Sequence, residues 1–259
     1  MARSSRTPAP GPSLLGSLYQ LLREASRAVE KFPGDPAGMA HLLRTRVKRL
    51  QSLCRLVPRG EKWRDAFLPP CRDLKDLFAE TRDATIVQGL AERYAPGEAR
   101  HLRVAAPPDL ARAEKLIASA TKVLGDYVRW DSIEWKDIAD RAVGTYRAAR
   151  GAWRAAEHKN APDAEFHDWR RRVKRLLYQC EYLGGRARLV RFTRRVDRLG
   201  EILGEIQDVC MAEDWLKKHR TLSVPPDLAR TKQTLRREAL RRGPVLLSPR
   251  PREFRDLLG

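Results

Sequence analysis

Two segments of the chain carry the same cationic side chains at helical spacing. The shared positions are His41, Arg44 and Lys48 in the first segment and His167, Arg170 and Lys174 in the second. With about 100° between successive residues of a helix, each set falls in a narrow stripe that repeats about every 5.4 Å. Arg grips phosphate oxygens with a planar fork, Lys supplies a mobile charge and His an N–H donor. None of these groups supplies a nucleophile, so the pattern indicates binding of a linear polyanion.

The two stripes differ at one end. Arg55 extends the first stripe, Arg171 lies beside the second, and Glu181 stands where the repeat would place a counterpart of Arg55. One such stripe is typical of a solvated helix face, but its repetition favours a functional anion site. The acidic replacement predicts that the two stripes do not bind an anion equally.

The stripes belong to a longer internal repeat with three aligned blocks. The paired segments are 19–30 with 146–157, 41–54 with 167–180, and 74–83 with 199–208, at offsets of 127, 126 and 125. Three blocks in one order predict a duplicated unit. The first block also repeats arginines, which we add to the candidate anion site: Arg23, Arg27, Arg150 and Arg154.

Helices are the elements that must position these side chains. Strand signals are scarce, and apolar residues recur at three- and four-residue spacing almost throughout. In the first motif they form a seam opposite the stripe: Leu43, Val47, Leu50, Cys54 and Val57. We therefore predict an all-α protein with long helices, in which two four-helix bundle units are related by a pseudo-two-fold axis.

Clusters of Pro, Gly and Asp divide the chain into about eight long helices. The predicted segments are a disordered tail (1–13), a first unit (14–106) and a second unit (107–259) whose first part (107–145) includes the connecting region, all within one domain. We expect four carboxylates to cap helix N-termini: Asp35, Asp109, Asp163 and Asp227. Arg242-Gly243-Pro244 is predicted to end the last long helix, before a short turn within 251–258.

An acidic set follows each stripe at i, i+4 and i+7, one face of a single helix. The members are Asp76, Glu80 and Asp83 in the first unit and Glu201, Glu205 and Asp208 in the second. They could chelate a divalent ion, or pair with arginines of a neighbouring helix and brace them. We favour pairing, because a bundle rich in Arg needs internal counter-charges. We predict no metal site and no cofactor, since cations around His41 and His167 would repel a metal ion, and we disfavour a catalytic base there.

The whole chain is strongly basic. Its 52 Lys and Arg against 33 Asp and Glu give a formal charge of +19, which points to polyphosphate, nucleic acid or an acidic membrane as partner. No stretch approaches the roughly 20 apolar residues of a membrane span, so we expect a soluble protein. The four cysteines form no metal-binding pattern, which indicates reduced thiols. The six tryptophans do not interleave with basic residues as base-stacking platforms would, so we expect most of them in the core.

At these motifs the sequence resembles the CHAD family, the conserved histidine α-helical domain, which binds inorganic polyphosphate. The first motif, His41-Leu-Leu-Arg44-Thr-Arg-Val-Lys48-Arg49-Leu50, is similar to the family's His-x-x-Arg-x-x-x-Arg-Arg-Leu, with Lys for one Arg. The second, from His167 to Gln179, is similar to the family pattern throughout, as is the Leu-Gly-x-x-x-Asp segment from Leu203 to Asp208. The first unit departs from the pattern with Phe78-Ala79 where the family often has Leu-Gly. The resemblance covers nearly the whole chain.

The resemblance implies that cations of both units bind one polyphosphate chain across a basic surface or central groove. The residues that it implies are His41, Arg44, Lys48, Arg49, His167, Arg170, Arg171, Lys174 and Arg175. Some family members are fused to a triphosphatase domain with an ExExK signature. That signature is absent here, so we expect a non-enzymatic binding protein in the cytoplasm, with polyphosphate granules and their proteins as candidate location and partners. A sequence-independent binder of nucleic-acid backbones is the alternative, and a metal-dependent phosphohydrolase is less favoured.

Overall fold

The computed structural model describes residues 13–58, 60–94, 102, 105–127, 134–184, 187–218 and 226–259, and every regular element in them is a helix. The all-α prediction is therefore confirmed. The first half contains α1 (Leu14–Lys31), the 3-10 helix η1 (Phe32–Gly34), α2 (Pro36–Cys54), α3 (Lys62–Leu77), α4 (Ala79–Tyr94) and α6 (Leu110–Tyr127). The second half contains α7 (Trp135–Glu157), α8 (Asp163–Leu183), α9 (Ala187–Lys218), α10 (Pro226–Leu247) and α11 (Pro251–Leu258).

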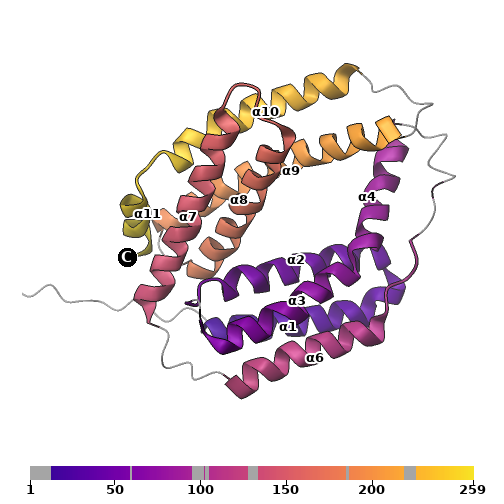
Figure 1. Ribbon diagram of the computed structural model, residues 1–259, viewed down its shortest axis with the longest axis vertical. Coiled ribbons are helices and arrows are strands. Elements are labelled where there is room, and N and C mark those ends of the chain that lie inside the picture. The colour runs from indigo at the N-terminus through magenta and orange to yellow at the C-terminus, as the bar shows by residue number, and fades with distance from the viewer. Residues whose placement is uncertain are drawn as a thin grey trace, which may run out of the picture.

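The helices form two groups that meet at α2 and α8 (Figure 1). In one group α1 packs on α2 and α6, and α3 packs on α2 and α6. In the other, α8 packs on α7 and α9, and α10 packs on α9 and α7. By these contacts α6 belongs with the first group, although the boundary expected after residue 106 assigned it to the second unit. The disordered tail expected at 1–13 lies outside the described residues except for Ser13, and the pseudo-two-fold axis stays a prediction.

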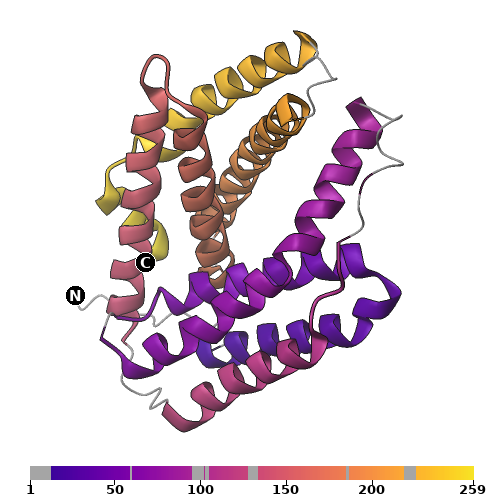
Figure 2. The ribbon, with the colours of Figure 1, turned by 45° about the vertical axis from the view of Figure 1, so that its right-hand side comes forward.

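Helix α4 leaves the first group and extends toward the ends of α9 and α10 (Figures 1 and 2). A small apolar cluster holds it there, in which Ala91 of α4 is buried with Ala212 and Trp215 of α9 and Leu228 of α10. The two groups are thus joined at two places, through α2 with α8 and through α4 with α9.

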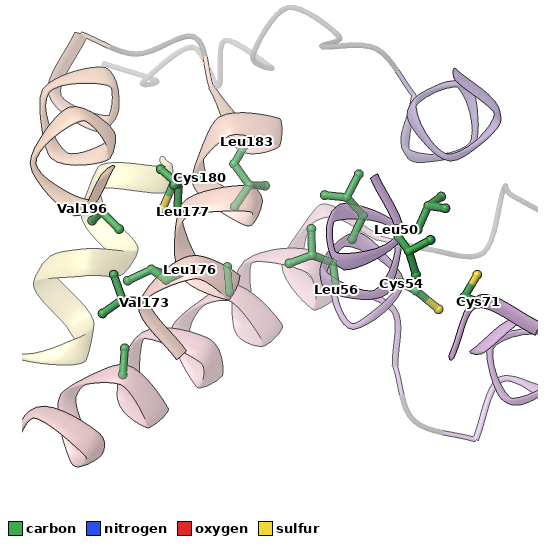
Figure 3. Close-up of a cluster of buried hydrophobic side chains, with 14 of the residues drawn as sticks. Leu50, Cys54, Leu56, Cys71, Val173, Leu176, Leu177, Cys180, Leu183 and Val196 are labelled. Atoms are coloured by element: carbon green, nitrogen blue, oxygen red, sulfur yellow. The ribbon is translucent and has the colours of Figure 1, made fainter. Parts of the chain in front are cut away.

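The apolar seam predicted for the first motif is buried, although α2 ends at Cys54 and Val57 lies beyond it. Leu43, Val47, Leu50, Cys54 and Val57 are each at most 1% exposed. Figure 3 shows Leu50 and Cys54 close to Cys71 of α3, while Val173, Leu176 and Cys180 of α8 gather near Val196 of α9. Each such side chain contributes about 1.5–3 kcal/mol on burial, so the seams fix which face of α2 and α8 turns away from the core.

The first acidic set does not lie on one continuous helix, contrary to the prediction. The helix breaks at Phe78, whose backbone has φ −101° and ψ 14°, so Asp76 belongs to α3 and Asp83 to α4. The corresponding part of α9 is unbroken through Leu203 and Gly204. Phe78 is fully buried and packs against Phe32 with 5.4 Å between ring centroids, which anchors the break in the core.

Two of the four predicted N-caps are confirmed. Asp35 accepts a hydrogen bond from the amide of Gly38, and Asp109 accepts one from the amide of Arg112, both at 2.9 Å. The other two predictions are wrong, because Asp163 and Asp227 lie inside the first turns of α8 and α10. The carboxylate of Asp163 instead binds Lys232 and Arg236 of α10, and that of Asp227 pairs with Arg230 at 3.5 Å.

The predicted end of the last long helix is also wrong. Helix α10 continues through Pro244 to Leu247, and the expected short turn is the eight-residue helix α11. Gly243 has a packing role here, since a Cβ at this position would lie 2.6 Å from the indole of Trp153 on α7. Close approach of two helices explains this glycine better than a helix end does.

The tryptophans and cysteines agree with the sequence analysis where the structure describes them. Trp63, Trp153, Trp169 and Trp215 are buried, Trp135 is 39% exposed, and Trp130 lies outside the described residues. All four cysteines are buried and unpaired thiols, and burial raises their pKa values. No helix in the described part of the chain is long and apolar enough to cross a membrane.

Candidate functional site

A cavity of about 640 Å³ lies between α2 and α8, with α3, α4 and α9 contributing to its walls. Its described lining holds ten Lys and Arg side chains against three carboxylates. The cations are Arg44, Lys48, Arg49, Arg55, Lys75, Arg82, Arg170, Arg171, Lys174 and Arg175, and the carboxylates are those of Glu181, Asp197 and Glu201. Such an excess of one charge inside a hollow concentrates anions there.

A buried polar contact fixes α2 against α8 at the cavity. The side-chain amide of Gln179 is fully buried and donates to the carbonyl of Ser52 at 2.8 Å. An ion pair of 3.0 Å between Arg49 and Glu181 joins the same two helices, and the guanidinium of Arg49 lies 5.1 Å from the centre of the Tyr178 ring. These contacts orient the cationic stripes of α2 and α8 toward the same cavity.

The break at Phe78 positions Arg44. Because α3 ends at Leu77, the carbonyl of Lys75 in its last turn is available, and Arg44 donates to it at 2.9 Å. Burial lowers the pKa of Arg44, while the carboxylates of Asp83 and Asp76 oppose that shift. The departure from Leu-Gly to Phe78-Ala79 thus gives Arg44 a backbone partner.

The predicted pairing of the acidic sets with arginines of a neighbouring helix is not among the ion pairs of the described residues, although Asp76 and Asp83 favour the charged form of Arg44 at longer range. Asp76 and Asp83 pair with their own neighbours in sequence, Lys75 at 3.0 Å and Arg82 at 3.2 Å. In the second half Asp208 stabilises the charge of Arg170, whose pKa burial lowers, and Glu201 pairs with Arg198 at 3.1 Å. Glu80 and Glu205 are exposed.

Gly200 of α9 makes room for the second stripe, because a Cβ at this position would lie 3.1 Å from Cε of Lys174. Gly204 faces the same stripe, and a Cβ there would lie 3.6 Å from Nε of Arg170, at ordinary van der Waals distance. The long side chains of α8 can therefore lie along α9, where Lys174 pairs with Asp197 at 3.3 Å. Gly204 belongs to the Leu-Gly-x-x-x-Asp segment, and its contact with Arg170 gives that segment a role at the site.

Lys48 has the most perturbed charge of the stripe. Burial lowers its pKa to about 8, and the cations Arg170, Arg44, Arg82 and Lys75 lower it further. Partial burial, with Arg82 and Lys48 nearby, also lowers the pKa of His41, which is therefore a neutral N–H donor at pH 7. The close approach of these cations has an electrostatic cost, which a bound anion would relieve.

Replacing Lys48 with Met is expected to stabilise the protein at pH 7 by about 1–3 kcal/mol, after a discount for solvent screening. The pKa is lower in the folded protein than its ordinary value of 10.5, so the unfolded chain binds this proton more tightly. The contribution of Lys48 to stability therefore rises between about pH 8 and 10.5, and the advantage of the variant should shrink over that window. Urea unfolding at pH 7 and pH 10 measures this, with exposed Lys115→Met as the control. A less stable Lys48→Met protein at pH 7 would contradict the proposed repulsion.

The structure brings nine of the sequence-predicted residues to the cavity and leaves five elsewhere. Those that line it are His41, Arg44, Lys48, Arg49, Arg55, Arg170, Arg171, Lys174 and Arg175. Those outside its lining are Arg23, Arg27, Arg150, Arg154 and His167. Arg150 donates to the carbonyl of Ser248 at 3.3 Å, and Nδ1 of His167 lies 2.5 Å from Oε1 of Gln207 on α9.

Two cations of the cavity were not predicted from the sequence. Lys75 and Arg82 line it from α3 and α4. At the offset of 125 their counterparts are Gly200 and Gln207, so a search for repeated cations could not find them. The sequence feature that could have indicated them is that each directly precedes a member of the acidic set, Asp76 or Asp83.

The charge of the cavity lining suits an anion. Within the described residues no group of three or more His, Cys, Asp or Glu side chains is placed to hold a metal. Glu181 and Asp197 are instead paired with Arg49 and Lys174. The arrangement can hold a multiply charged, elongated anion by charge-assisted hydrogen bonds from several helices.

Neither the curated proteins nor the solved structures contain a match to this chain. Among protein families, residues 14–217 match the CHAD domain, a segment that includes both stripes and every residue of the cavity lining. The chain therefore belongs to the CHAD domain family.

Proposed function

We propose that the cavity between α2 and α8 binds inorganic polyphosphate as a ligand. The observation that carries this proposal is the convergence of two cationic stripes, from segments 126 residues apart, on one cavity with ten cations and three carboxylates in its described lining. The CHAD domain is associated with polyphosphate binding, which agrees with this chemistry. Polyphosphate carries a charge on each monomer, so it can contact cations on both walls at once.

The lining favours an inorganic chain over single-stranded nucleic acid. Besides the imidazole of His41, its described residues include one aromatic ring, that of Tyr178, and the guanidinium of Arg49 lies over that ring. Proteins that bind single strands usually stack bases on exposed aromatic rings. Charge and shape without such rings match a polyanion that has no bases.

We further propose that binding is not followed by hydrolysis and that the protein acts in the cytoplasm, with polyphosphate granules as the candidate location. The thiols of the described chain are buried and protonated, and the carboxylates of the lining are engaged with cations. A phosphate-release assay with magnesium or manganese tests the enzymatic alternative. Turnover that is lost on replacing Asp83 or Asp208 would establish a phosphohydrolase.

A competition experiment tests the ligand class. Fluorescently labelled polyphosphate of defined length is bound to the protein at fixed ionic strength, with EDTA present, and duplex DNA or RNA is added at equal phosphate concentration. We expect binding to survive the chelator and unlabelled polyphosphate to displace the probe at least about tenfold more effectively than nucleic acid. Equal displacement by nucleic acid would replace the proposal with a general backbone binder.

A further inference from the structure

Helices α2, α8, α9 and α4 form a closed ring of contacts around the cavity. Helix α2 packs on α8, α8 on α9, α9 on α4, and α4 on α2. Each of the four contributes side chains to the cavity lining, among them Arg82 from α4. Figures 1 and 2 show α4 crossing from the first group of helices toward the ends of α9 and α10. A long anion that passes through the cavity is therefore encircled by the protein.

The contacts of this ring differ in how much they bury. Helices α2 and α8 share the main apolar core, and the buried hydrogen bond from Gln179 to Ser52 joins them. The contact of α4 with α9 belongs instead to a separate, smaller apolar cluster. Among the described side chains of α4, that of Ala91 alone is buried there. Segments with few buried apolar contacts open at a lower free energy than the core, so the ring is weakest where α4 meets α9.

Helix α4 is anchored at its start and lightly held along its length. It follows the break at Phe78, whose fully buried ring fixes that end in the core. Farther along, the side chains of Ile86, Val87 and Leu90 are only half-buried. Burial of apolar side chains is the main attraction between packed helices, and α4 has little of it beyond Ala91. A helix that is fixed at one end and lightly held at the other can pivot at the break.

Charge at the base of α4 favours opening of the ring. Arg82, in the first turn of α4, lines the cavity and pairs with Asp83 of the same helix at 3.2 Å. Burial lowers the pKa values of Lys48 on α2 and Arg170 on α8 most, and the charge of Arg82 lowers both further. Arg82 is thus repelled by cations on both walls. A bound polyanion would replace this repulsion with attraction and draw α4 toward the cavity.

We propose that α4 is a latch, which opens at its contact with α9 and α10 to admit a polyphosphate chain sideways and is held closed by the bound chain. The identity of the ligand as a long polyanion rests on the function proposed above. Through a ring that never opens, a chain could enter only by its end. Through an opening latch any internal segment can enter, and the chain leaves sideways only when the latch reopens.

Polyphosphate that carries a bulky group at both ends distinguishes the two routes of entry. Such a chain cannot enter a closed ring by its end, whereas an opening latch admits its middle. We expect the wild type to bind the doubly capped chain with an affinity within about twofold of that for the uncapped chain, measured by calorimetry, because the same phosphates contact the cavity. Exclusion of the capped chain would show that chains enter by their ends, and the latch would be refuted.

Ala91→Glu tests the latch contact itself. A carboxylate at this fully buried position cannot remain in an apolar cluster, so the contact with α9 should open. Association and dissociation of the labelled capped chain, followed by stopped-flow fluorescence, should both become about tenfold faster. Gly89→Glu makes the same charge change at an exposed position of α4, where a Cβ would meet no neighbouring group within 4 Å, and should change either rate less than about twofold. Equal rates in the two variants would contradict the proposal.

Measurements on the wild type separate the latch from the proposed function. If the wild type binds no uncapped polyphosphate, the function fails. If it binds uncapped chains but excludes capped ones, the function stands and only the latch is lost. Amide hydrogen exchange needs no variant, so it decides the matter even if Ala91→Glu does not fold. Amides of α4 should exchange faster than those of α2 and α8 in the free protein and become protected when polyphosphate is added. Protection of α4 equal to that of α2 in the free protein would rule out the latch.

Discussion

Reversing four charges in the stripes is expected to abolish polyphosphate binding while leaving the helices intact. The variant replaces Arg44, Lys48, Arg170 and Lys174 with Glu, two positions on each wall of the cavity. Each lost charge-assisted contact costs on the order of 1.5–3 kcal/mol, so affinity should fall at least about 10³-fold. The fold should survive, because the new carboxylates relieve repulsion among cations such as Arg49, Arg82 and Arg175.

Binding is measured by calorimetry with polyphosphate of one length, and helix content by circular dichroism. A matched variant reverses four exposed arginines outside the cavity lining: Arg147, Arg191, Arg195 and Arg237. It has the same net charge, so it should lose no more than about tenfold in affinity through the weaker long-range field. If the stripe variant still held polyphosphate, or if both variants lost affinity alike, the cavity would not be the site.

Polyphosphate affinity is expected to fall about 10³-fold between 50 and 200 mM monovalent salt. A polyanion releases condensed counterions when cations of a protein replace them, and for single strands the slope of log affinity against log salt is roughly −0.7 for each charge neutralised. Contacts with about eight of the cavity cations would account for this decrease in polyphosphate affinity. A nucleotide-sized ligand that touches two or three cations would show a far shallower slope.

The slope is obtained from titrations at four or five salt concentrations, in the wild type and in Lys48→Met. Removal of one cavity cation should make the slope shallower by about 0.7, whereas Lys115→Met on the exposed face of α6 should leave it unchanged. A wild-type slope near zero would mean that cavity cations do not release counterions, and binding would then have another origin.

Lys48 shows how function and stability oppose each other at this site. Its burial and the neighbouring cations lower its pKa to about 8, so the charged side chain destabilises the folded protein. A bound polyanion should raise the pKa of Lys48 again, so that Lys48 takes up a proton on binding and affinity declines as pH rises above about 8. The repulsion among the cavity cations therefore lowers the free energy of unfolding, and a bound anion offsets that loss, as expected for a binding site.

The helical class and most of the cavity cations could be predicted from the sequence, because both depend on local periodicity. The apolar seam at Leu43, Val47 and Leu50 fixes the buried face of α2, and a helix with one buried face must turn His41, Arg44 and Lys48 away from the core. The same reasoning holds for Arg170 and Lys174. The duplication then indicated that the two stripes act together.

Contacts between segments that are distant in sequence could not be predicted from local periodicity. Whether Gly243 ends a helix or admits Trp153, and whether Asp163 caps a helix or binds Arg236, depends on which helices become neighbours. Arg23 and Arg154 repeat in sequence but lie on α1 and α7, outside the lining, whereas Arg82 has no repeated counterpart and lies inside it. The repeated positions reflect the internal repeat of the sequence, whereas the packing of the helices determines which side chains lie close together.

Residue types and their spacing were enough to predict an all-helical, cationic protein with a repeated motif, because helix periodicity and charge are properties of short segments. The mutual placement of the two stripes, the break that provides Arg44 with a carbonyl partner, and the ion pair between Arg49 and Glu181 required the folded chain. Those features depend on burial and on distances between residues far apart in sequence, which no local pattern specifies.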